Sequence, residues 1–229
     1  MTHIDSRKLT RWYDFQAPFY AAWRNDLDGP LVREVVSAVA ERPPSSLLDV
    51  GCGAGLFAVP LAARLAEARV AGADLSAGML AVARGQARRR GLANLSLLRA
   101  DATALPFATG AYDAVVMAGL LPNVNDRERV LAEAARVLSP GGRLFLVEYD
   151  RTTMGLAAKV LFRVMILGYK TVSFVFRRFR FAEGWNLRAS TVDPDGLPAG
   201  LRRAGLQPLS TRSSSGHLVI ESGKGEPAV

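Results

Sequence analysis

The chain has 229 residues, 49% of them apolar, and a formal net charge of +8. This length and composition suit one domain with a sizeable core and exclude a scaffold held by internal disulfides, because Cys52 is the only cysteine. The N-terminus is polar and mixed in charge and has no secretory signal, so we expect a cytoplasmic protein.

The positive charge is concentrated in one segment. Residues 1–150 have 17 basic and 16 acidic residues, whereas residues 151–212 have 11 basic and 3 acidic ones. This distribution predicts a local basic surface. No appended RNA-binding module accompanies it, so we expect no nucleic-acid partner.

In chain order, the sequence first predicts an N-terminal helical cap over residues 1–40. Residues 8–27 are typical of an aromatic-rich helix or helix pair, and Leu31–Ala40 predicts a second helix, ended by the prolines that follow. Apolar strands and helices then alternate, which indicates a parallel sheet. We expect strands at 46–51, 69–74, 95–99, 112–117 and 143–149, and helices near 55–67, 77–90 and 126–138.

The last part of the chain predicts two further strands. Leu206–Arg212 and His217–Ser222 alternate and are joined by a Ser-Ser-Gly turn, as in an antiparallel hairpin. The whole chain, 1–229, then forms one α/β domain. We expect a doubly wound, Rossmann-like, seven-stranded sheet, mostly parallel with an antiparallel C-terminal hairpin strand, and helices on both faces.

The turn between the first strand and its helix has three glycines, Gly51, Gly53 and Gly55. Glycine accepts dihedral angles that side chains resist, and it lets a ligand approach the backbone. The helix that follows offers unpaired N–H groups and its positive end. The turn therefore predicts a nucleotide-type cofactor site, in which we interpret Cys52 as a small turn residue and not as a nucleophile.

An acid follows at the end of the second strand. Asp74 comes 19 residues after Gly55, about where doubly wound domains place the carboxylate that holds ribose hydroxyls. The third glycine of a dinucleotide fingerprint would fall at position 56, which is Leu56. The spacing therefore disfavours a dinucleotide.

These motifs resemble those of class I S-adenosylmethionine-dependent methyltransferases. The Asp-x-Gly-x-Gly-x-Gly pattern at 49–55 resembles their first motif, 73–80 their second, and 100–102 the motif after their third strand. Residues 112–117 and 136–144 are similar to their fourth strand and to the turn into their fifth. The resemblance implies S-adenosylmethionine as cofactor and S-adenosylhomocysteine as product.

One branch of that class is more similar than the others. Residues 12–20, 119–127 and 148–149 resemble the ubiquinone/menaquinone biosynthesis C-methyltransferases. The similarity is close over 45–149 and poor over 151–205. Pro122 stands where that family usually has Arg.

The resemblance implies a role for each matched residue. The three glycines would let the backbone approach the amino-acid part of the cofactor, and Asp49 would hold the turn or the amino group. Asp74 would hold the ribose and Asp101 the adenine, while Met79 covers the adenine face or packs in the core. Leu75, Ala102 and Met117 complete the expected cofactor-binding set.

Residues for the acceptor and for proton transfer are less clear from the sequence. The substrate-contacting candidates are Tyr13, Tyr20, Asn123, Phe162 and Tyr169. No catalytic base stands out; Tyr149 and Asp150 at the end of the fifth strand and His217 in the hairpin are the candidates. No Cys/His cluster predicts a metal.

Residues 151–185 predict an apolar and basic helical insertion. No uncharged run approaches the ~20 residues of a transmembrane helix. Three interpretations are open: an insertion packed on the domain, a lid over a hydrophobic pocket, or a membrane-contact helix over 156–180. Four cations lie within about 40° of each other on a helical wheel, namely Lys159, Arg163, Lys170 and Arg177.

We therefore expect an S-adenosylmethionine-dependent methyltransferase of small-molecule biosynthesis that acts on a lipophilic molecule. A quinone-like ring or a polyketide or terpenoid natural product would suit the apolar insertion. The alternatives are phospholipid N-methylation at a membrane surface and a non-catalytic, cofactor-binding relative. Both a monomer and a homodimer are compatible with the sequence.

Overall fold

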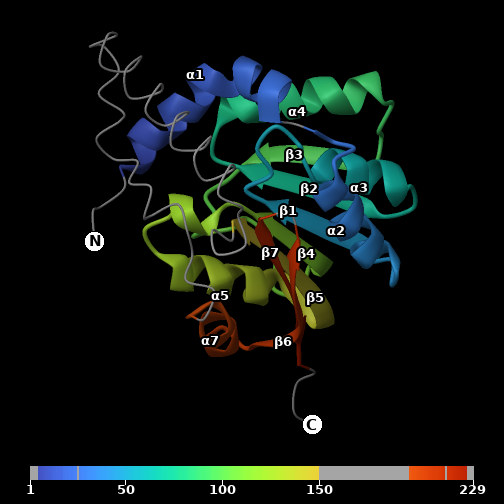
Figure 1. The fold of residues 1–229 in the computed structure, drawn as a ribbon, viewed down its shortest axis with the longest axis vertical. Coiled ribbons are helices and arrows are strands. Elements are labelled where there is room, and N and C mark those ends of the chain that lie inside the picture. The colour runs from blue at the N-terminus through green and yellow to red at the C-terminus, as the bar shows by residue number, and fades with distance from the viewer. Residues whose placement is uncertain (1–4, 25, 150–195, 215, 226–229) are drawn as a thin grey trace.

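A computed structural model describes residues 5–24, 26–149, 196–214 and 216–225 (Figure 1). The predicted insertion at 151–185 lies outside these residues. The N-terminal part forms two helices, α1 (Ser6–Arg24) and α2 (Pro30–Ala40). They confirm the predicted helices of the cap, except that the first begins earlier than expected.

The central part alternates strands and helices as predicted. Proline and glycine at its turns and β-branched and leucine residues in its strands account for the alternation. Its elements are β1 (Ser46–Val50), α3 (Ala58–Arg64), β2 (Arg69–Asp74), α4 (Ala77–Arg89), β3 (Leu95–Arg99), β4 (Tyr112–Ala118), the 3₁₀ turn η1 (Leu121–Asn123), α5 (Arg127–Val137) and β5 (Leu138–Tyr149).

The C-terminal part adds α7 (Gly196–Arg203), β6 (Leu206–Ser214) and β7 (His217–Lys224). The described strands form one seven-stranded sheet in the order β3-β2-β1-β4-β5-β7-β6. β1 to β5 are parallel, and β7 runs antiparallel to both β5 and β6. The predicted doubly wound sheet with its antiparallel hairpin strand is confirmed.

Side chains that alternate along the strands divide the core into two layers. Leu48, Met117 and Leu146 pack on one face with the apolar sides of α5 and α7. Leu47 and Phe145 pack on the other face with α2 and α3. Because each inner strand is buried on both faces, helices are required on both sides of the sheet.

Besides α1, three elements differ from the prediction. α3 (Ala58–Arg64) is shorter than the helix expected near 55–67. β5 begins at Leu138, which pairs with Tyr112, and the register shifts before Ala114 pairs with Arg143. The shift takes the Pro-Gly-Gly turn into the strand, so β5 starts earlier than expected. α7 was not predicted; it packs against α5 and β6.

α1 lies outside the two layers. Figure 1 shows it side by side with α4, across the carboxyl ends of the first strands. This position places α1 over the edge of the sheet where the glycine-rich turn lies.

Candidate functional site

A cavity of about 340 Å³ lies at the carboxyl ends of the parallel strands, with α1 as one wall. This is the edge at which open α/β sheets bind ligands. Its wall combines the turn after β1, the ends of β2 and β4, and the loops after β3 and β4. The lining residues are Ser6, Leu9, Thr10, Tyr13, Val50, Gly51, Gly53, Ala73, Asp74, Leu75, Ser76, Met79, Ala100, Asp101, Ala102, Thr103, Leu105, Ala118, Gly119, Leu120, Asn123, Val124, Asn125 and Asp126.

The glycine turn presents its backbone to this cavity. Gly51 and Gly53 line it, and both have left-handed backbones, with φ of 74° and 53°. A Cβ built on Gly53 would meet nothing nearer than the Gly51 carbonyl oxygen at 4.0 Å. The space above the turn is therefore open to a ligand that contacts the main chain.

Gly55 has a different role from the one predicted. It does not line the cavity, and a Cβ there would lie 2.7 Å from Val59 Cγ2 and 3.2 Å from Ala83 Cβ. Its φ is 89°. Gly55 therefore lets the turn pack closely on α3 and α4.

Asp74 joins the glycine turn to the start of α4. One carboxylate oxygen accepts the Gly53 N–H at 2.9 Å, and the other accepts the Ser76 N–H at 2.8 Å. Burial raises the pKa of Asp74, and the two N–H donors oppose that shift. Each oxygen keeps a lone pair for a further donor, such as a ribose hydroxyl.

Asp49 lies beneath the turn and not on the cavity wall. It is 1% exposed, and burial raises its pKa to about 7. It accepts a hydrogen bond from the backbone of Ala58 at the start of α3, and Oδ2 has no partner among the described residues. Of the two predicted roles, holding the turn agrees with this contact.

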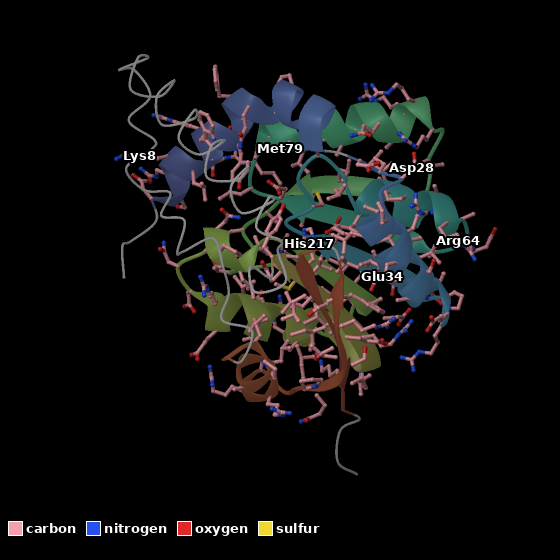
Figure 2. All side chains as sticks on the ribbon, viewed as in Figure 1. Lys8, Asp28, Glu34, Arg64, Met79 and His217 are labelled. Carbon is pink, nitrogen blue, oxygen red and sulfur yellow. The ribbon has the colours of Figure 1, made fainter. Side chains whose placement is uncertain are left out.

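The other predicted cofactor residues divide between wall and core. Leu75, Met79, Asp101 and Ala102 line the cavity, and Figure 2 shows Met79 beneath α1. Asp101 Oδ1 accepts both the N–H and the hydroxyl of Thr103, at 2.8 Å each. The placement of Met117 as a cofactor residue is not supported, because it is fully buried in the sheet core.

Tyr13 and Asn123 meet across the cavity, although they are 110 residues apart. The Tyr13 hydroxyl lies 3.4 Å from Asn123 Oδ1, and Asn123 Nδ2 donates to the Gly119 carbonyl at 2.8 Å. The side chain of Tyr20 and all of Phe162, Tyr169 and Asp150 lie outside the described residues.

Tyr149 and His217 are brought together by the β5–β7 pairing. They face each other in the ladder, with ring centroids 4.6 Å apart. A Cβ on Gly119 would lie 3.9 Å from Tyr149 Cε2, so the Tyr149 ring stands behind a cavity-lining glycine. Neither ring itself lines the cavity.

Sequence reasoning missed several wall residues. Ser6, Leu9 and Thr10 share with Tyr13 the i, i+3, i+4, i+7 face of α1, a spacing that would have grouped them. Sequence reasoning also missed Glu148, which does not line the cavity: it is 1% exposed on β5, and its Oε1 accepts the Leu121 N–H of η1 at 3.1 Å.

A second, more open hollow of about 430 Å³ lies between α4 and β3. It holds none of the predicted site residues, so we place the site at the strand ends. Over the described ranges, no three His, Cys, Asp or Glu side chains gather as a metal site. Within these ranges, too, no helix is both long and apolar enough to cross a bilayer.

The charges of the cavity wall fit a cationic cofactor. Three carboxylates line it, those of Asp74, Asp101 and Asp126, and none of its lining residues in the described chain is Lys, Arg or His. A pyrophosphate would find no cation there, whereas the sulfonium and ammonium groups of S-adenosylmethionine carry the matching charge. With the open glycine turn, this chemistry fits the cofactor that the motifs imply.

Comparisons with known proteins identify the family of the chain. A family model described as a methyltransferase domain matches residues 48–146. The chain is 42% identical over 134 residues to the demethylmenaquinone methyltransferase of Thermus thermophilus, a match that covers 57% of this chain and 60% of the relative. It is 32% identical over 197 residues to the ubiquinone/menaquinone biosynthesis C-methyltransferase of Acidiphilium cryptum, covering 83% of this chain and 78% of the relative.

The chain belongs to this family of S-adenosylmethionine-dependent methyltransferases. The class and branch that the motifs predicted are thereby confirmed, and S-adenosylmethionine is the family's cofactor. The chain spans about three fifths of the length of the Thermus relative.

Solved structures confirm the fold. The [4+2]-cyclase SpnF has a TM-score of 0.72 at 21% identity, over 99% of this chain and 100% of that one. At this identity the likeness concerns the fold alone.

Proposed function

We propose that this methyltransferase transfers the methyl group of S-adenosylmethionine to a carbon of a lipophilic, quinone-type ring. The lining of the cavity supports the proposal best. Beside its carboxylates it has apolar side chains at the β4 end, Leu120 and Val124, with Leu9 opposite on α1. A flat apolar ring suits this part of the wall.

The names of the relatives support the same acceptor class. One relative is a demethylmenaquinone methyltransferase and another a ubiquinone/menaquinone biosynthesis C-methyltransferase. The polyketide and terpenoid acceptors expected from the sequence have no such support. The contact of residues 156–180 with a membrane stays a prediction. Such a contact would bring the enzyme to the bilayer in which a lipophilic substrate resides.

The residues of the cavity would divide the work between binding and positioning. The backbone of Gly51 and Gly53, which is open at Gly53, would hold the amino-acid part of the cofactor, Asp74 the ribose, and Asp101 the adenine side. S-adenosylmethionine, when bound, supplies an electrophilic methyl group, whose carbon bonds to the ring carbon while its bond to sulfur breaks and S-adenosylhomocysteine leaves. The wall residues of α1 and η1 would orient the ring and exclude water.

A ring carbon that gains a methyl group must lose its proton. The stacked Tyr149 and His217 are the candidate acceptors, because Tyr149 stands behind Gly119, next in the chain to the apolar Leu120 of the wall, and His217 stacks on Tyr149. A neutral imidazole can take the proton near pH 7.

The alternatives make different demands on the same cavity. A phospholipid amine carries an adjacent phosphate, for which the described wall offers no cation. A non-catalytic relative would bind the cofactor without turnover.

The deciding experiment uses purified protein and S-adenosylmethionine labelled in its methyl group. The acceptors are a demethylated prenyl naphthoquinone, kept as its electron-rich hydroquinone by excess dithionite so that the ring carbon can attack the methyl group, and, separately, phosphatidylethanolamine vesicles. We expect label in the extracted quinone and none in the phospholipid. Label in the phospholipid alone would overturn the acceptor assignment, and cofactor binding with no transfer to either would favour the non-catalytic relative.

A further inference from the structure

Asp14 joins α1 to the first turn of α4 beside the cofactor site. Its Oδ1 accepts the Ser76 hydroxyl at 2.6 Å and the Gly78 N–H at 2.8 Å. Ser76 is itself the N-cap of α4, because its hydroxyl oxygen accepts the Met79 N–H at 3.1 Å. Asp14 therefore brings a negative charge from another helix to the positive end of α4.

The two helix backbones meet closely at this point. A Cβ built on Gly78 would lie 2.9 Å from both Cα and the carbonyl oxygen of Asp14. Glycine at 78 is thus a condition for the contact. Next to it, Ala17 of α1 is buried with Met79 and Ala54.

The segment that leads from β2 into the first turn of α4, to which α1 binds, also forms part of the proposed cofactor site. Asp74 and Ser76 line the cavity, and Asp74 also holds the glycine turn through Gly53. α1 in turn supplies the opposite wall through the face that contains Leu9 and Tyr13. A shift of α1 away from α4 would therefore open the cavity on the side of the ribose position.

Charge gives a physical reason for coupling between α1 and the cofactor. Asp14 and Asp74 both accept a hydrogen bond from Ser76, so the docked helix places two like charges near each other. Burial is the main cause that raises the pKa of Asp74, and the Asp14 charge adds to it. Donors from ribose hydroxyls and a nearby cation would stabilise both carboxylates. A ligand with these groups favours the docked state of α1, and docked α1 then favours the ligand to the same extent.

We propose that Asp14 is a positioning residue that docks α1 over the cofactor, so that docking of α1 and binding of the cofactor are thermodynamically coupled. This inference rests on the cofactor of the proposed function and not on its acceptor. It predicts that α1 is released more often in the free protein than in the cofactor complex.

Two measurements without turnover test the coupling. The first is the affinity for S-adenosylhomocysteine by calorimetry. The second is limited trypsin cleavage after Arg7, Lys8 and Arg11, which are exposed on α1 and report its release. Figure 2 shows Lys8 pointing away from the body of the molecule.

Asp14→Ala removes both acceptor contacts. We expect affinity for S-adenosylhomocysteine to fall about tenfold, which corresponds to about 1.4 kcal/mol. Cleavage within α1 should become faster in the free protein, and the protection by ligand should shrink. At saturating cofactor, kcat should be retained while KM for the cofactor rises.

Two further variants separate docking from a general loss of structure. Asp14→Asn keeps the Oδ1 acceptor and should retain most of the affinity and protection. Gly78→Ala keeps Asp14 but pushes α1 away, and it should reproduce the effects of Asp14→Ala. Arg203→Ala is the matched control, because it removes an exposed ion pair with Glu128 between α5 and α7; it should change neither measurement.

The outcomes distinguish this inference from the proposed function. If Asp14→Ala and Gly78→Ala both bind S-adenosylhomocysteine like the wild type, with unchanged protection, the inference is wrong while methyl transfer can stand. If the wild type binds neither the cofactor nor its product, the proposed function itself fails.

Discussion

Asp74 is the residue on which cofactor affinity should depend most. Its two oxygens tie the glycine turn to α4, and the residue lines the cavity. Sequence spacing alone identified it, because an acid at the end of the second strand of a doubly wound sheet lies at the edge where such sheets bind their ligands.

Asp74→Ala should weaken binding of S-adenosylhomocysteine by at least about tenfold, since it removes the proposed acceptor for the ribose and leaves the Gly53 and Ser76 N–H groups unpaired. Calorimetry measures the affinity, and Asp126→Ala, which removes another carboxylate of the same wall, is the comparison. Wild-type affinity in Asp74→Ala would contradict the placement of the ribose.

His217 is the residue to test for proton transfer. If His217 takes the proton, His217→Gln should lower kcat by about 10²-fold or more while affinity for S-adenosylhomocysteine is unchanged, because the ring stacks on Tyr149 and is not part of the cavity wall that would hold the cofactor. Tyr149→Phe keeps the stacked ring and tests the hydroxyl separately. Unchanged kcat in both variants would remove this pair from the mechanism.

At the residue scale, the motifs predicted which residues lie near the site better than they predicted which side chains point into it. Gly51, Gly53 and Asp74 lie on the cavity wall as expected. Gly55 and Met117 belong to the same motifs, but one packs on α4 and the other points into the core. Alternation along a strand decides which side chains reach the site, and the sequence motif does not encode which face the cavity occupies.

At the element scale, α5 is fixed by one buried acid. Glu133 Oε2 accepts the Leu105 N–H at 2.8 Å, and both its oxygens bind Arg136. The Arg136 guanidinium also donates hydrogen bonds to the carbonyl oxygens of Leu105 and Phe107. These contacts attach the loop after β3 to α5, and that loop forms one side of the cavity.

Glu133→Ala should lower the free energy of unfolding by about 2 kcal/mol, because it leaves a buried N–H and a guanidinium without their acceptor. Urea denaturation measures the change. Arg129→Ala is the control: its side chain is 58% exposed and lies 3.8 Å from Glu133, so we expect less than about 0.5 kcal/mol. Equal effects in the two variants would contradict the special role of Glu133.

Elements with strong periodicity were predictable, and those defined by tertiary contacts were not. The strands from β1 to β4 and helices α2, α4 and α5 follow from apolar patterns and caps, such as Asp126 at the start of α5. α7 has eight residues with two glycines and a proline, so propensity disfavours it, and burial of Leu197 and Leu201 holds it in place.

At the scale of the whole molecule, the carboxyl edge of the sheet gathers buried acids from distant parts of the chain. Asp49, Asp74 and Glu148 come from three strands, and burial raises the pKa of all three. Asp49 Oδ2 and Glu148 Oε2 have no partner among the described residues. The sequence predicted that the cofactor site lies at this edge of the sheet. It could not predict how close these three acids lie to one another, because that depends on the order of the strands in the sheet.

These acids predict how the stability of the cofactor-free protein depends on pH. The pKa of Glu148 is raised to about 8 and that of Asp49 to about 7, above their ordinary values of 4.5 and 3.8. Between about pH 4 and 8 the folded protein therefore holds protons that the unfolded chain releases. Stability is fully present below that window and is lost as pH rises through 7 and 8.

Glu148→Gln isolates one of these groups. Glutamine keeps an oxygen that can accept the Leu121 N–H and cannot ionise, so the loss of stability between pH 5.5 and 8.5 should shrink by at least about 1 kcal/mol relative to the wild type. Urea denaturation at the two pH values measures this difference. Glu128→Gln, at a side chain that is 73% exposed, should leave it unchanged. An unchanged difference in Glu148→Gln would mean that Glu148 is already ionised in the folded protein, and its buried charge would then require a cationic partner at the cavity end of β5.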